Sequence, residues 1–115
     1  MAIAHAISGQ PIALLPLSGE PGAAQTVALF KTNHLEVMRL VLPKGKAFPP
    51  HQVSGDITVQ CLKGLVDVPM EDQSGREVRH QALSAGELLY LAGGVRHGLV
   101  GLEDAVVLVT IVLHA

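Results

Sequence analysis

Short runs of apolar and β-branched residues, separated every few positions by glycine or proline, follow one another along this 115-residue chain. No segment keeps the 3.6-residue period of a helix for more than about ten residues. The runs predict strands at residues 12–17, 26–31, 35–42, 57–62, 65–70, 77–83, 88–91 and 105–113. Many short strands bounded by turn residues are typical of an all-β sandwich or barrel. Because no linker or internal repeat is visible, we expect one domain over residues 1–115.

The alternation within these runs indicates which side chains share a face, since residues two apart on a strand point the same way. In the run 57–62 one row contains Ile57, Val59 and Cys61, and the other contains Thr58, Gln60 and Leu62. The run 105–113 is apolar in both rows, so its outer row needs a cover. That cover is either a second subunit or the N-terminal segment. The segment 72–75 predicts a hairpin turn in which Gly75 has a positive φ.

Composition excludes several classes of protein. The net charge is −2 with acidic and basic residues mixed, and no basic block is present to bind a nucleic-acid backbone. Cys61 is the single cysteine, which rules out an intrachain disulfide and favours a reducing compartment. The longest apolar stretch is far shorter than the ~20 residues of a membrane span. The N-terminus also lacks the basic start of a signal peptide. We therefore expect a cytoplasmic protein that binds neither nucleic acid nor membrane.

Two glycine-framed segments each carry one histidine. The first, 45–64, reads Gly45-Lys-Ala-Phe-Pro-Pro-His51-Gln-Val53-Ser-Gly-Asp56-Ile57 and ends at Gly64. The second, 86–101, reads Gly86-Glu-Leu-Leu-Tyr-Leu-Ala92-Gly-Gly94-Val-Arg-His97 and ends at Gly101. They resemble the two conserved motifs of the cupin superfamily, Gly-x5-His-x-His-x(3,4)-Glu-x6-Gly and Gly-x5-Pro-x-Gly-x2-His-x3-Asn. The resemblance implies a cupin-type double-stranded β-helix, a jelly-roll barrel, and a homodimer.

The resemblance also implies a metal site, but the ligand positions differ. Metal-binding cupins hold the ion with three histidines and a glutamate. Here His51 and His97 match, whereas Val53 and Ile57 occupy the positions of the other histidine and the glutamate. The two histidines are candidate ligands for one divalent transition metal (Zn, Ni, Mn, Fe or Cu). Asp56 is a weak candidate for a third ligand, and its alternative role is that of a turn residue beside the adjacent glycine.

The interior predicted from these motifs is largely apolar. The expected lining beside the two histidines is Val53, Ile57, Val59, Cys61 and Leu99. Cys61 is alternatively a small buried hydrophobic residue. Such a pocket favours a small, mostly apolar ligand. One hypothesis is a metal-dependent enzyme, such as a cupin oxygenase or isomerase. The alternative is a metal-free binding or sensing module without catalytic activity.

Overall fold

The computed structural model describes residues 6–15, 26–71, 74 and 78–113. These residues form the strands β1 (Val27–Lys31), β2 (Leu35–Leu42), β3 (Ala47–His51), β4 (Ile57–Lys63), β5 (Leu65–Glu71), β6 (Val78–Ser84), β7 (Leu88–Leu91), β8 (His97–Gly101) and β9 (Ala105–Val112). Within these ranges no helix has the length and apolar character needed to cross a membrane.

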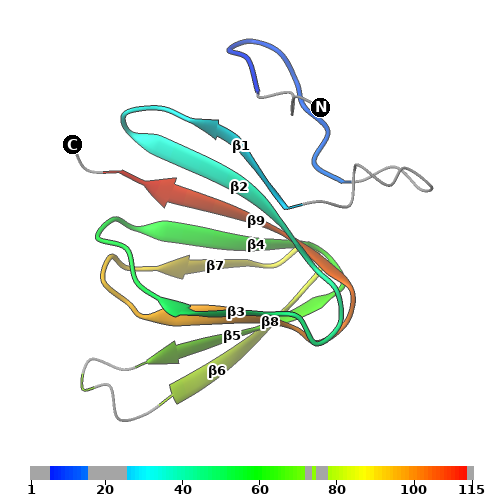
Figure 1. Ribbon diagram of the computed structural model, residues 1–115, viewed down its shortest axis with the longest axis vertical. Helices are drawn as coiled ribbons and strands as arrows, with labels where there is room; N and C mark the ends of the chain where they lie inside the picture. Colours follow the sequence, from blue (N-terminus) through cyan, green and yellow to red (C-terminus); the bar gives the residue numbers. More distant parts are fainter. Residues whose placement is uncertain (1–5, 16–25, 72–73, 75–77, 114–115) are drawn as a thin grey trace.

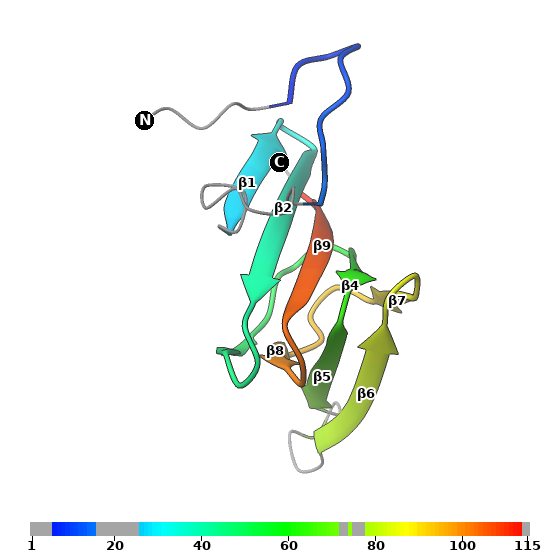
Figure 2. The same cartoon turned by 90° about the vertical axis from the view of Figure 1, so that its right-hand side faces the viewer.

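The strands form two antiparallel sheets that face each other (Figures 1 and 2). The five-stranded sheet has the order β1-β2-β9-β4-β7, and the four-stranded sheet has the order β3-β8-β5-β6. In Figure 1, β9 lies between β2 and β4, although β2 and β4 come much earlier in the chain. The prediction of an all-β fold is confirmed.

Most predicted strands are present, with one exception and two additions. β2 and β7 have the predicted bounds. Residues 12–15 form no strand, so that part of the prediction at 12–17 is wrong, and the remainder lies outside the described residues. β3 and β8, which carry the two motif histidines, were missing from the predicted strands. The predicted turn at 72–75 also lies outside the described residues, except that Ser74 is in a turn.

The core lies between the two sheets. On β4 the row of Ile57, Val59 and Cys61 faces inward, with exposed fractions of 3%, 0% and 0%. β5 and β8 contribute apolar residues from the opposite sheet, among them Val66, Val68 and Leu99. Burying such side chains stabilises the fold by roughly 25 cal/mol for each Å² of apolar surface removed from water.

The outer face of the five-stranded sheet carries a second, smaller cluster. Val27, Leu29 and Val37 are buried there, and Leu14 from the N-terminal segment packs on them together with Leu108 of β9. The N-terminal segment therefore covers part of the outer row of β9. Further along β9, Val112 remains 42% exposed on the same outer row. The predicted homodimer stays a prediction.

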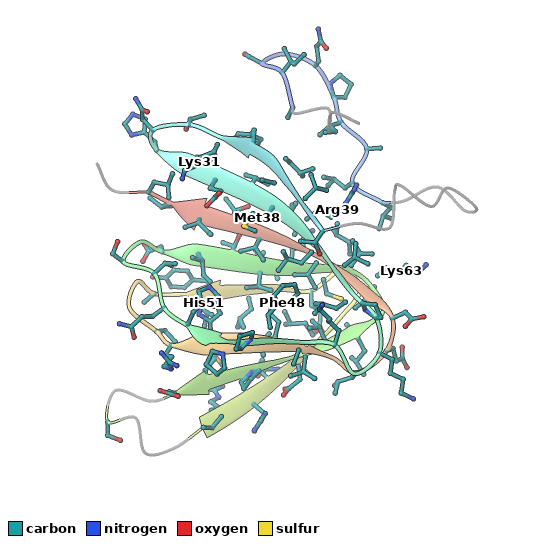
Figure 3. The ribbon with its side chains drawn as sticks, in the orientation of Figure 1. Lys31, Met38, Arg39, Phe48, His51 and Lys63 are labelled. Carbon is teal, nitrogen blue, oxygen red and sulfur yellow. The ribbon has the colours of Figure 1, made fainter. Side chains whose placement is uncertain are left out.

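Arg39 on β2 connects the N-terminal segment to this outer face. Its side chain is only 9% exposed, and its Nη1 donates hydrogen bonds to the carbonyl oxygens of Ala13 and Leu14 at 3.4 and 3.2 Å. Figure 3 shows the side chain extending toward that segment. The Nε of Arg39 is buried and has no hydrogen-bond partner, and no carboxylate of the described residues pairs with this guanidinium. Two backbone carbonyls therefore provide the compensation for a buried positive charge.

Candidate functional site

The two motif histidines come together through the pairing of two strands. His51 is the last residue of β3 and His97 is the first residue of β8, and they lie opposite each other in the antiparallel pair. Their ring centroids are 4.8 Å apart, with an angle of 49° between the ring planes. The pairing shifts its register between Phe48 and His51, across the two prolines of β3. Proline has no backbone N–H to donate, which makes it a natural place for such an irregularity.

A backbone carbonyl fixes the tautomer of His97. The Nδ1 of His97 lies 3.0 Å from the carbonyl oxygen of Val95. Because a carbonyl only accepts hydrogen bonds, Nδ1 carries the proton, and Nε2 of the neutral ring is an acceptor. Burial lowers the pKa of His97, the hydrogen bond to Val95 opposes this, and the neighbouring His51 lowers the pKa further. His97 is therefore a neutral imidazole at pH 7 with a lone pair on Nε2.

The loop after His51 and the loop before His97 are held together by two hydrogen bonds. Gly94 has φ of 88°, which a side chain would strain, and its N–H donates to the carbonyl of Val53 at 2.8 Å. The N–H of Gly93 donates to Oδ1 of Asp56 at 2.9 Å. The carboxylate of Asp56 therefore accepts a hydrogen bond from the backbone of the second motif. Asp56 has an exposed side chain and is not among the residues that line the cavity.

His51 and His97 line a cavity of about 260 Å³ between the sheets. The other lining residues are Thr26, Met38, Leu40, Phe48, Val53, Ile57, Val59, Leu99, Val109 and Ile111. Four of the five residues expected from the sequence as apolar lining therefore lie in the cavity wall. Met38 and Phe48, labelled in Figure 3 with His51, come from β2 and β3.

Cys61 differs from this expectation. It is fully buried, it is not part of the cavity wall, and its Sγ lies 3.4 Å from the carbonyl oxygen of Lys63 and 3.6 Å from that of Gly64. Cys61 faces inward in the same row as Ile57 and Val59, as predicted. However, it lies nearer the end of β4, beyond the cavity. Burial raises the pKa of the Cys61 thiol. The residue is therefore a buried thiol rather than a thiolate ligand.

Several lining residues were not identified from the sequence. Met38 and Leu40 lie two apart on β2, and Val109 and Ile111 lie two apart on β9. Their alternation marked them as sharing a face, but both rows of β9 are apolar. The pattern therefore did not indicate which row faces the histidines.

The residues present do not fit the metal centre that the sequence motifs suggest. Among the residues that the structure describes, no group of three or more His, Cys, Asp or Glu could hold a metal ion. Val53 and Ile57 have no donor atoms, and Asp56 binds the N–H of Gly93. The donor set is two imidazoles, whereas protein zinc centres use three or four protein ligands.

A wider groove of about 390 Å³ opens between the edge strands β6 and β7. It contains Glu71, whose Oε1 lies 3.4 Å from Nε of Arg96, and it contains no histidine. Because it is more open and lacks paired imidazoles, it is not the candidate site.

Two facing antiparallel sheets, with the two motif histidines meeting between them, define a double-stranded β-helix of the cupin type. Comparison with solved structures shows this fold directly. A cupin superfamily protein from Desulfitobacterium hafniense superimposes with a TM-score of 0.70 at 14% identity, covering 91% of this chain and 100% of the other. An RmlC-like cupin from Methanocaldococcus jannaschii gives 0.66 at 22% identity, with coverage of 83% and 86%. No family model matches the chain, and no curated protein matches it.

One neighbour has a named activity. Oxalate decarboxylase from Bacillus subtilis, described for its Mn(II) centres, superimposes with a TM-score of 0.65 at 21% identity over 76% of this chain. The present chain spans about a quarter of that enzyme's length, 24%. At these identities the likeness concerns the fold.

Proposed function

We propose that this cupin-fold protein binds a small, largely apolar molecule in the cavity between its sheets, oriented by the imidazoles of His51 and His97. The observation that carries the proposal is a cavity with mostly aliphatic and aromatic walls and a few polar groups, including two ring systems 4.8 Å apart. A concave apolar site with a few converging polar groups is the usual form of a small-molecule pocket. Replacing metal ligands by Val53 and Ile57 enlarges the apolar part of the wall.

A metal-dependent activity is the second candidate. The observation in its favour is the free Nε2 of His97 beside a second imidazole, since neutral imidazole binds Zn, Ni, Cu or Fe. The Mn(II) centres named for the oxalate decarboxylase neighbour support it at the level of the fold. We rank it second because the described residues provide two donors and no third. An oxygenase or isomerase reaction would depend on such an ion being held.

Elemental mass spectrometry on untagged protein purified without chelators separates the two candidates. We expect less than stoichiometric metal in the wild type, before and after incubation with Zn²⁺, Ni²⁺, Mn²⁺, Cu²⁺ or anaerobic Fe²⁺. The matched variants are His51→Ala/His97→Ala and, as a control, His80→Ala, whose ring is 64% exposed and bound to Asp67. Near-stoichiometric metal that is lost in the double variant and kept in His80→Ala would overturn the metal-free proposal.

We further propose that the chain forms a homodimer through the outer face of β4, β7 and β9. Leu88 and Tyr90 on β7 are 61% and 60% exposed there, and Val112 on β9 is 42% exposed. Apolar patches of this kind are typical of interaction surfaces. Light scattering at micromolar concentration should give the mass of two chains, and Tyr90→Lys should shift the equilibrium toward one. A monodisperse monomer would contradict this proposal.

A further inference from the structure

The geometry points to a particular class of ligand for this cavity: a neutral molecule that donates a hydrogen bond, an alcohol or a phenol, with an apolar body. This inference rests on the proposed function and narrows it. The reasons are the orientation of one imidazole, the lack of charge in the cavity wall, and the volume available.

The first reason is the acceptor on His97. Its Nδ1 hydrogen is held by the carbonyl of Val95, so the nitrogen left for a ligand is Nε2, which accepts. His97 is 4% exposed and belongs to the cavity wall. A ligand that displaces water from this nitrogen must bring its own donor. Otherwise a buried acceptor loses its partner, which is costly.

The second reason is the charge of the wall. The lining residues include no Lys, Arg, Asp or Glu. Lys46 lies 5.9 Å from the centroid of the Phe48 ring, but it is exposed and is not part of the lining. A carboxylate entering the cavity would lose its hydration without meeting a buried cation. The cavity therefore discriminates against acids and favours neutral molecules.

The third reason is size. A cavity of about 150 Å³ is large enough to hold benzene. The space here is about 260 Å³, which leaves room for one ring with a hydroxyl group and one or two further carbon atoms. The ring of Phe48 provides an aromatic surface at the cavity wall, which suits an aromatic or alicyclic body.

Three molecules test the inference: 4-methylphenol and p-xylene, which have nearly the same shape, and the somewhat larger anion 4-methylbenzoate. Their affinities for the full chain are measured by NMR titration at pH 8, where His97 is neutral. We expect 4-methylphenol to bind at least about tenfold more tightly than p-xylene, because only the phenol donates to Nε2. We expect 4-methylbenzoate to bind most weakly.

Each outcome decides a different point. Equal affinity for 4-methylphenol and p-xylene, or tightest binding of 4-methylbenzoate, would overturn this inference while leaving the apolar binding site in place. Failure of all three to bind would count against the proposed function itself, and with it against the inference.

Variants locate the effect at one nitrogen. His97→Phe keeps a ring and removes the acceptor, so the ratio between phenol and xylene affinities should fall to about one. His97→Gln can still accept through its carbonyl oxygen and should restore part of the preference. His80→Ala, on β6 and outside the cavity wall, should leave the ratio unchanged. Because the readout is a ratio, a variant that merely loosens the fold does not imitate the result. A full preference in folded His97→Phe would overturn the role assigned to Nε2.

Discussion

Asp56 provides the sharpest test of how the two motifs are used. The sequence allowed it two roles, a metal ligand or a turn residue. In the structure its Oδ1 accepts a hydrogen bond from the N–H of Gly93 at 2.9 Å. We therefore predict that Asp56→Ala weakens the connection between the two loops and lowers stability. Asp56→Asn retains an oxygen acceptor at the same position and should do so much less.

The size of the effect follows from the geometry. A hydrogen bond to a charged acceptor contributes about 1.5–3 kcal/mol. Because Asp56 is exposed, solvent screening reduces this to about 1 kcal/mol. In a domain of this length about 1 kcal/mol corresponds to about 4 °C in Tm. With an m value of about 1.5 kcal/mol/M, the urea midpoint should fall by about 0.7 M in Asp56→Ala.

The assay is urea unfolding followed by circular dichroism, with metal content and ligand affinity measured on the same preparations. Asp56→Asn should lose less than half as much stability as Asp56→Ala, and both should bind ligand like the wild type. The reasoning is refuted if Asp56→Ala unfolds at the wild-type midpoint. It is also refuted if Asp56→Asn, although stable, loses a metal that the wild type holds, because that pattern belongs to a ligand.

Three further predictions concern single residues. Gly64 has a φ of 80°, and a Cβ added there would overlap the carbonyl oxygen of Asp104. Gly64→Ala should therefore lower the free energy of unfolding, measured with urea, by more than about 3 kcal/mol. Gly86 has a φ of 92° but no atom near the position of a Cβ, so Gly86→Ala should lower the free energy of unfolding by only about 1–2 kcal/mol. Equal losses in the two variants would contradict the role of the Asp104 carbonyl. Because burial lowers the pKa of His97, this residue takes up a proton at a higher pH in the unfolded chain than in the folded one. The free energy of unfolding of the wild type should therefore fall as the pH drops below ~6.5. The fall should be smaller in His97→Gln. A parallel decline in both proteins would show that His97 is not responsible. The thiol of Cys61 should react with a disulfide reagent only after unfolding, and rapid labelling of the native protein would show that it is accessible.

The strands that were predicted and those that were missed differ in a physical way. β2 and β7 are dense in Leu, Val and other strand-forming residues, and their bounds follow from the sequence. β3 contains two adjacent prolines, and β8 has glycine at its second and last positions, so local preference argues against both strands. They form strands because each pairs with the other beside the core. Pairing between distant segments, rather than local strand propensity, therefore determines that β3 and β8 are strands.

The same distinction applies to the site. The meeting of His51 and His97 depends on the pairing of β3 with β8 and was suggested by the motif resemblance alone. The contribution of Met38 and Val109 to the wall depends on which face of β2 and β9 turns inward, and alternation does not reveal this. One feature of the sequence indicates that Arg39 is buried: it shares a strand face with the apolar residues Leu35, Val37 and Val41. Its contact with two carbonyls of the N-terminal segment has no counterpart in the local pattern.

The central place of β9 in its sheet has a consequence for synthesis in the cell. β2 and β4 are translated long before β9, yet each pairs with β9 and neither pairs with the other (Figure 1). While the ribosome is still making the intervening residues, each of the two strands presents an unpaired backbone edge and an apolar row to water or to chaperones. The five-stranded sheet can close only after β9 has emerged. The sheet should therefore form late, once β9 is available, and on the millisecond-to-second scale of proteins dominated by distant pairings.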